Sequence, residues 1–297
     1  MKLPSDFQFS QASLQAFVDC PQHFYLRYVQ GLVWPAVEAE PIEVHERRMA
    51  LGQHFHRMVH QYLVGVDEAR IAQMANEPEL EQWWRNYQSY QPATALLPKS
   101  EETQASHKTF PEVTLSAALA GYRLLAKYDL IAIRAGERAA NRLAVIFDWK
   151  TSRHRPRRET LAATLQTRVY RYLLVRAGGY LNGNVAVQPD QVEMIYWFAE
   201  FPESPERFPY DDVQYQADEA YLQGLVQRIE ALPAENVQMT DDVRACRYCP
   251  YRSYCDRGQR AGELDEQIEI VTSEVETEAR LDFDFEQIAE IEFKGGV

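Results

Sequence analysis

Two aspartates and a lysine lie beside apolar runs in the middle of the 297-residue chain. Asp129 lies in Lys-Tyr-Asp-Leu-Ile, and Asp148 lies in Ile-Phe-Asp-Trp-Lys, where Lys150 comes two residues later. Half-buried carboxylates on neighbouring strands cost free energy and repel each other unless something pairs with them. A divalent cation removes both costs, so the pattern predicts a metal site with a cationic side chain beside it.

The Asp148-x-Lys150 spacing puts both side chains on one face of an extended strand. The carboxylate would then contact the metal, and the ammonium would lie near an attacking water or a scissile phosphate. Phosphodiester hydrolysis requires this combination of activated water and positive charge at the developing anion. Taken singly, an Asp or Lys at a strand edge is more often a solvated residue or part of a salt bridge.

Gln166 and Tyr170 lie four residues apart, on one face of an expected helix. Neither belongs to that helix's apolar stripe, which consists of Leu161, Leu165, Val169 and Leu173. We expect the pair to orient Lys150 or to touch a nucleic-acid backbone.

The elements that position these residues alternate between strand and helix. Strands are expected at 124–133 and 143–149, then a helix at 160–177 ended by Gly178-Gly179, a strand at 192–198 and a helix from about 217 to 232. This order predicts an α/β body with a mixed sheet. Upstream, helices are expected at 9–28, capped at Ser10 or Ser13 and broken at Cys20-Pro21, at 44–64, and around Trp83 and Trp84.

The chain has four cysteines, Cys20 near its start and Cys246, Cys249 and Cys255 near its end. No secretion signal and no run of eighteen apolar residues is present, so the expectation is a soluble cytoplasmic protein without membrane partners. In a reducing compartment, closely spaced cysteines are better interpreted as metal or cluster ligands than as disulfides. Soft thiolates suit either zinc or an iron–sulfur cluster, and four cysteines alone do not decide between them.

The formal net charge of -13 is distributed unevenly. Residues 263–297 hold twelve acidic residues against two basic ones, so residues 1–262 are close to neutral. We therefore expect a folded body at 1–262 and an acidic tail at 263–297, which is either a solvated, partly disordered segment or an interaction peptide that covers a basic groove. Cations concentrated between positions 150 and 176 favour phosphate contact: Lys150, Arg153, His154, Arg155, Arg157, Arg158, Arg168, Arg171 and Arg176.

An acid followed by Asp148-Trp149-Lys150 and Gln166-x-x-x-Tyr170 resembles the PD-(D/E)XK nuclease superfamily, specifically its RecB-like branch. Leu51-Gly52-Gln53-His54-Phe55-His56 resembles that branch's Gly-x-x-x-His helix. The resemblance implies a restriction-endonuclease-like core with a central mixed β-sheet flanked by helices. It also implies Mg2+ or Mn2+ bound by His56, Asp129, Asp148 and the backbone carbonyl of Trp149. A lone helical histidine is more often structural, and His54 and His60 compete with His56.

With the cysteines, the resemblance covers most of residues 8–257, although it says little about residues 65–120. Cys20-Pro21-Gln22-His23-Phe24-Tyr25 and Cys246-x-x-Cys249-x5-Cys255 resemble the opening and closing motifs of iron–sulfur members, which include CRISPR-associated exonucleases and AddB-type nuclease domains. The resemblance implies a 4Fe-4S cluster on Cys20, Cys246, Cys249 and Cys255 that joins the N- and C-terminal ends. Zinc is the less favoured occupant, because the chain lacks its usual layout of two Cys-x-x-Cys pairs.

The expected function is thus a metal-dependent DNA nuclease, an exonuclease on single-stranded ends, acting in DNA repair, recombination or CRISPR adaptation. No Gly-rich phosphate loop is present, so a helicase partner would be a separate chain, as would a CRISPR-adaptation protein. The alternatives are an enzyme that needs a larger complex, a non-catalytic DNA-binding or scaffolding subunit, and a zinc-stapled protein of unrelated function. The sequence leaves polarity, exo- or endonuclease action, DNA or RNA preference, oligomeric state and pathway open.

Overall fold

The computed structural model describes residues 3–33, 40–97, 107–134, 143–233, 235–247 and 249–257. The expected loop between the two central strands and the acidic tail at 263–297 lie outside these residues.

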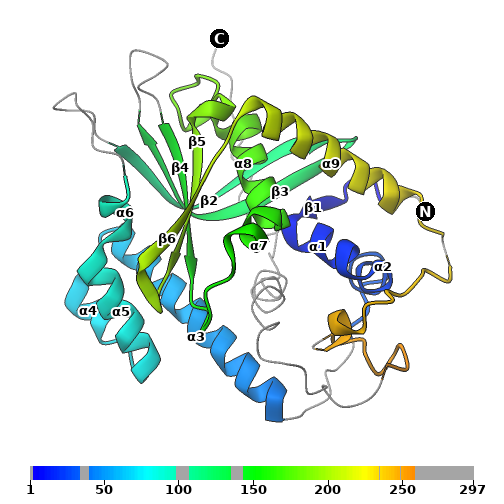
Figure 1. Cartoon of the computed structure of the whole chain (residues 1–297), viewed down its shortest axis with the longest axis horizontal. Helices are drawn as coiled ribbons and strands as arrows, with labels where there is room; N and C mark the ends of the chain where they lie inside the picture. Colours follow the sequence, from blue (N-terminus) through cyan, green and yellow to red (C-terminus); the bar gives the residue numbers. More distant parts are fainter. Residues whose placement is uncertain are drawn as a thin grey trace.

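The described strands form one mixed sheet (Figure 1). They are β1 (Gln8–Ser10), β2 (His107–Leu119), β3 (Tyr122–Arg134), β4 (Leu143–Lys150), β5 (Val192–Phe198) and β6 (Phe201–Pro209). The order is β1-β3-β4-β5-β6, and β2 pairs with β3. β1 runs parallel to β3 and β4 parallel to β5, whereas the pairs β2–β3, β3–β4 and β5–β6 are antiparallel. The predicted mixed sheet, with its two central strands paired, is confirmed.

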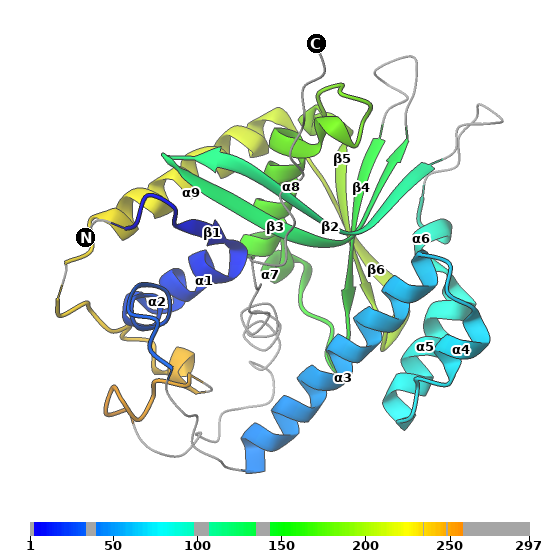
Figure 2. The same ribbon diagram turned by 180° about the vertical axis from the view of Figure 1, so that it is seen from behind.

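Helices cover both faces of the sheet (Figures 1 and 2). They are α1 (Gln11–Asp19), α2 (Pro21–Phe24), α3 (Glu40–Leu63), α4 (Glu68–Ala72), α5 (Pro78–Tyr90), α6 (Pro92–Ala95), α7 (Arg158–Ala163), α8 (Leu165–Ala177) and α9 (Asp212–Glu230). Alternate residues of a strand point to opposite faces, so Ile146 of β4 packs in the core with α1, α8 and α9, while Phe147 packs in the core with α3 and α5.

The connection between β4 and β5 brings helix residues to the C-terminal end of β4. Parallel neighbours need a crossover, which α7 and α8 supply. The prediction of one helix at 160–177 was wrong, because Thr164 has an extended backbone (ψ 146°) and divides the segment. The Thr164 hydroxyl accepts a hydrogen bond from the Thr167 N–H (3.3 Å) and caps α8. Gln166 therefore lies in the first turn of α8.

The N-terminal segment follows its local sequence closely. Ser10 caps α1, since its hydroxyl accepts from the Ser13 N–H (3.1 Å) and the Ser13 hydroxyl accepts from the Ser10 N–H (2.9 Å). The helix ends at Cys20, whose backbone is extended, and Pro21 begins α2. The predicted cap and the predicted break at Cys20-Pro21 are both confirmed.

Three strands were not predicted. β1 falls where a helix was expected to begin, and β2 follows a stretch of mixed character. β6 contains Pro202, Pro205 and Pro209, which lack the N–H that a central strand requires. It lies at the edge of the sheet, where proline is tolerated.

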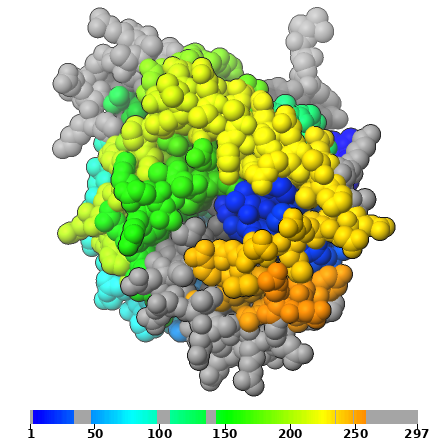
Figure 3. Space-filling model, turned by 45° about the vertical axis from the view of Figure 1, so that its right-hand side comes forward, coloured from blue at the N-terminus to red at the C-terminus, as the bar shows by residue number. Residues whose placement is uncertain are grey.

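The last described residues return to the N-terminal helices. In Figure 3 the segment ending at residue 257, coloured gold to orange, lies against the blue N-terminal segment. The Tyr251 hydroxyl donates to the Leu32 carbonyl (2.7 Å), and the Tyr251 ring lies 5.5 Å from that of His23. The two ends of the folded body therefore meet. Among the described helices, none has the length and apolar character needed to cross a membrane.

Candidate active site

The two predicted acids face each other where β3 and β4 separate. The last backbone pair of this antiparallel ladder at that end joins Leu130 and Phe147. Asp129 and Asp148 occupy the next opposing positions, beyond the ladder. Like charges at opposing positions repel, so each carboxylate needs its own partners, and the structure supplies a different set to each.

Asp129 pairs with the predicted histidine of α3. The His56 Nδ1 lies 3.0 Å from one Asp129 carboxylate oxygen, and the Trp149 N–H donates to the other at 2.8 Å. The second bond satisfies the Trp149 N–H, a backbone donor of β4 that lies beyond the last β3–β4 pair. The structure thus joins His56, Asp129 and the backbone of Trp149.

The charges of this pair shift both pKa values towards the ionised forms. Burial alone would lower the pKa of His56, but the charge and hydrogen bond of Asp129 raise it above its ordinary value. Burial alone would raise the pKa of Asp129, but the His56 charge, the His56 hydrogen bond and the Trp149 N–H lower it. A carboxylate held ionised is the form that binds a divalent cation.

Asp148, Lys150 and Gln166 form a closed buried triangle. The Lys150 ammonium lies 2.8 Å from Asp148 Oδ2 and donates to Gln166 Oε1 at 3.0 Å. The Gln166 amide donates to Asp148 Oδ1 at 2.7 Å. The three residues are only 3%, 7% and 8% exposed in that order. Gln166 therefore contacts both Lys150 and Asp148, and its role in orienting Lys150 stays a prediction.

Tyr170, the other predicted helix residue, packs into the core. Its ring lies 4.7 Å from that of Tyr128, and its carbonyl accepts a hydrogen bond from the Tyr128 hydroxyl (2.9 Å). It is 3% exposed and belongs to the core of the α8 face. These contacts with Tyr128 anchor α8 on β3 next to Asp129.

Helix α3 is fixed to the end of β4 by two residues that precede His56. Arg48 donates to the Thr151 carbonyl (2.6 Å) and to Glu200 Oε1 (3.1 Å). At Gly52, one turn later, an added Cβ would lie 2.9 Å from the Thr151 hydroxyl oxygen. Arg48 was not predicted as a site residue, because an arginine gives no local signal for a partner a hundred positions away. This contact explains the glycine of the Gly-x-x-x-His motif. Because Gly52 has no side chain, α3 approaches β4 closely enough for His56 to reach Asp129.

Substituting Gly52 by Ala is expected to lower the thermal midpoint of unfolding. The clash costs about 1–3 kcal/mol, which exceeds the helix preference for alanine of at most about 1 kcal/mol. Gly224→Ala in α9 is the matched control, because nothing lies within 4 Å of its Cβ position, and it should stabilise the protein slightly. Adding Thr151→Ala should remove most of the Gly52→Ala loss, and an equal loss in that background would contradict the close-approach explanation.

Most of the predicted cation stretch is neutralised within the protein. Ion pairs join Arg155 and Arg158 to Glu206, Arg168 and Arg171 to Asp218, and Arg176 to Glu219. Arg153, His154 and Arg157 are exposed, and in the described part of the chain their side chains form no ion pair or hydrogen bond with another residue. We therefore expect phosphate contact from these three residues alone among the cations after Lys150, the last residue of β4.

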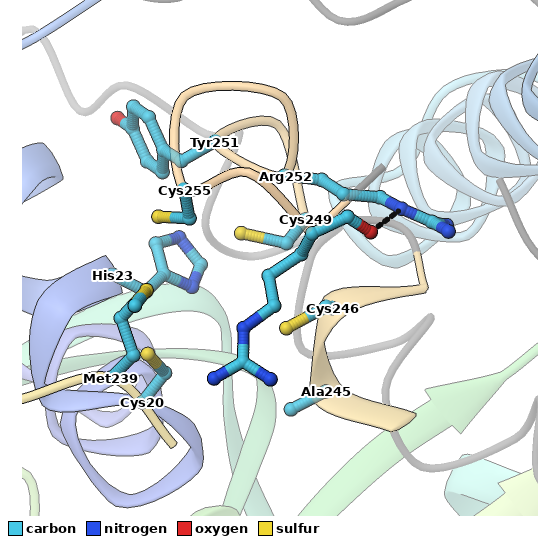
Figure 4. Close-up of a pocket in the computed structure, with 10 residues that line it drawn as sticks. Cys20, His23, Met239, Ala245, Cys246, Cys249, Tyr251, Arg252 and Cys255 are labelled. Atoms are coloured by element: carbon cyan, nitrogen blue, oxygen red, sulfur yellow. Dashed lines mark hydrogen bonds between the residues drawn. The ribbon is translucent and has the colours of Figure 1, made fainter. Parts of the chain in front are cut away.

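The four cysteines line one cavity, shown in Figure 4. All four are free thiols. Cys20 comes from the junction of α1 and α2, Cys246 ends a short 3-10 helix (Val243–Cys246), and the others follow in the adjoining turns. Burial raises the pKa of Cys249 to about 12, and burial followed by the charge of Cys20 raises the pKa values of Cys246 and Cys255.

The donor atoms are of the types that the expected groups bind. The thiols of Cys246, Cys249 and Cys255 have raised pKa values in the protein alone, and cysteines ionise to thiolates when a cation binds them. His56 with Asp129 offers one nitrogen and one oxygen donor 3.0 Å apart. In the part of the chain that the structure describes, no group of three or more His, Cys, Asp or Glu side chains is arranged to hold a metal ion. Asp148, which was also expected to bind the metal, contacts Lys150 and Gln166 in this structure.

Comparison with known proteins identifies the family. The model of the PD-(D/E)XK nuclease superfamily matches residues 8–256, and the chain belongs to that superfamily. No curated protein matches the sequence at a significant level. Among solved structures, a crystal structure of a "putative exonuclease" from Eubacterium rectale aligns with a TM-score of 0.49 and 9% identity, covering 91% of this chain and 98% of that chain.

Proposed function

We propose that the protein is a metal-dependent DNA nuclease of the RecB-like branch that acts on single-stranded ends. The observation that carries this proposal is the buried Asp148–Lys150–Gln166 triangle beside the His56–Asp129 pair. Burying a lysine and a carboxylate at a strand end costs folding free energy. The presence of both buried groups at this site therefore favours a catalytic role. Cleavage assays with Mg2+ or Mn2+, on single- and double-stranded DNA, test it.

His56, Asp129, Asp148 and the Trp149 carbonyl would hold the divalent cation, which would supply Lewis acidity and an activated water. Lys150 Nζ would then have one of two roles toward the water. As an ammonium it would position the attacking water and stabilise the negative charge that develops on the phosphate, whereas as a neutral amine it would accept a proton from that water. Gln166 keeps the ammonium in place, because its amide bonds both Lys150 and Asp148.

The cysteine cavity would hold a 4Fe-4S cluster on Cys20, Cys246, Cys249 and Cys255. Support comes from four free thiols lining one cavity where the N- and C-terminal segments meet. Zinc is the less favoured occupant. The cluster would be structural, because its ligands include none of the residues proposed to act on phosphate.

DNA would lie along the exposed cations that follow β4. Replacing Arg153 and Arg157 together by Glu is expected to weaken single-stranded DNA binding and to reduce the slope of log affinity against log salt by about 1.4, from about 0.7 per lost phosphate contact. Fluorescence anisotropy at several salt concentrations measures both. Arg123→Glu is the matched control, since this exposed arginine lies six residues before Asp129 on β3, about 20 Å away in an extended strand.

An unchanged salt slope in the double variant, with wild-type thermal stability, would exclude this path for the DNA. A reduced slope in the Arg123→Glu control would show that overall charge, not position, controls binding.

The alternative function is a non-catalytic DNA-binding or scaffolding subunit of a helicase–nuclease complex. The complete set of acids, lysine and glutamine favours the enzyme. A separate helicase or a CRISPR-adaptation protein is the partner we propose, in the cytoplasm, in repair, recombination or CRISPR adaptation.

A further inference from the structure

An imidazole lies among the four cysteines. His23 of α2 lines the same cavity as Cys20, Cys246, Cys249 and Cys255, and Figure 4 shows its ring among their side chains. Its Nε2 atom is buried and has no hydrogen-bond partner among the described residues. A buried polar nitrogen without a partner is costly, so its presence points to a group that the cavity would contain.

The ring is held in a defined orientation. It packs against the Tyr251 ring at 5.5 Å, and the Tyr251 hydroxyl is itself bonded to the Leu32 carbonyl at 2.7 Å. The other atoms around the cavity are mainly thiols, the Met239 side chain and two arginines, Arg252 and Arg257. Both guanidinium groups donate to backbone carbonyls, and an arginine cannot accept a hydrogen bond from His23.

We propose that His23 Nε2–H donates a hydrogen bond to a sulfur atom of the iron–sulfur cluster and thereby raises its reduction potential. This inference rests on the proposed cluster. A neutral imidazole carries one N–H, and sulfur is the acceptor that a four-thiolate cluster would present on every side. Hydrogen bonds to cluster sulfurs favour the reduced, more negative state, and so they tune the potential.

The test compares His23→Leu with His23→Gln in the full chain, purified without oxygen. A redox titration followed by electron paramagnetic resonance gives the midpoint potential, and iron and sulfide analyses give the cluster content. His23→Leu should shift the potential to more negative values at unchanged iron content, while His23→Gln, which keeps an N–H donor, should stay near the wild type. Met239→Leu is the matched control, because it alters the same cavity without removing a donor, and it should leave the potential unchanged.

Two results would overturn the proposal. A wild-type potential in His23→Leu would show that the imidazole does not bond the cluster, and loss of iron in both His23 variants would make His23 a ligand or a structural element instead. A wild-type protein purified without iron would overturn the cluster proposal itself, and iron analysis separates that failure from the other two.

Discussion

Lys150→Met is expected to lower the rate of DNA cleavage by about 10²–10³-fold or more, the loss typical when one group that stabilises transition-state charge is removed. It should also destabilise the fold, because Asp148 is 3% exposed and would lose its cation. Leaving one member of a buried ion pair unpaired costs about 3–5 kcal/mol. Cleavage rates and urea unfolding, measured on the same preparation, check both expectations.

Adding Asp148→Asn separates catalysis from stability. The double variant Asp148→Asn with Lys150→Met buries no charge at these two positions, and Asn still accepts a hydrogen bond from the Gln166 amide. We expect it to recover much of the lost stability while cleavage stays absent. Activity that returned together with stability would show that the single variant was merely unfolded and that Lys150 has no catalytic role.

Cys249→Ser is expected to reduce the iron content to near zero and to loosen the junction between the two ends of the chain. A serine oxygen is a poorer ligand than a thiolate for iron in a cluster, and metal binding of this kind contributes directly to folding. Hydrogen exchange should rise in α1, α2 and residues 243–257, while β4 and α8 keep their protection. Asp256→Asn is the matched control, because it alters an exposed residue beside Cys255 at a position with φ 54°, which Asn tolerates.

Retention of iron by Cys249→Ser, or a uniform rise in exchange across the whole sheet, would contradict the structural role assigned to the cysteines. The first result would remove Cys249 from the ligand set, and the second would make the cavity part of the main core.

Local sequence patterns predicted the central strands and the residues on them well. Asp148-x-Lys150 required only the two-residue period of a strand, and Gln166 required only its place on the following helix. The break at Thr164 was not predicted, because the apolar stripe continues through it, and β6 was missed because its prolines are acceptable only at an edge. Edge position depends on the whole sheet and is not encoded locally.

Charge was visible in the sequence, but its pairing was not. Arg155 and Arg168 belong to one basic stretch, yet each pairs with an acid about fifty positions later. The contacts of Arg48 and His23 could not be predicted for the same reason. Only the fold brings Arg48 to the Thr151 carbonyl and His23 to the cysteine cavity. Long-range contacts therefore decide which members of a motif-rich sequence remain available for function.

The most direct measurement of the central claim is the cleavage of end-labelled single-stranded DNA as Mn2+ is titrated into chelator-treated protein, with Asp129→Asn beside the wild type. We expect cleavage by the wild type that rises with Mn2+ and stops on chelation, and little cleavage by Asp129→Asn at any Mn2+ concentration. Cleavage that persists in chelator, or equal cleavage by Asp129→Asn, would contradict a metal-dependent nuclease site between β3 and β4.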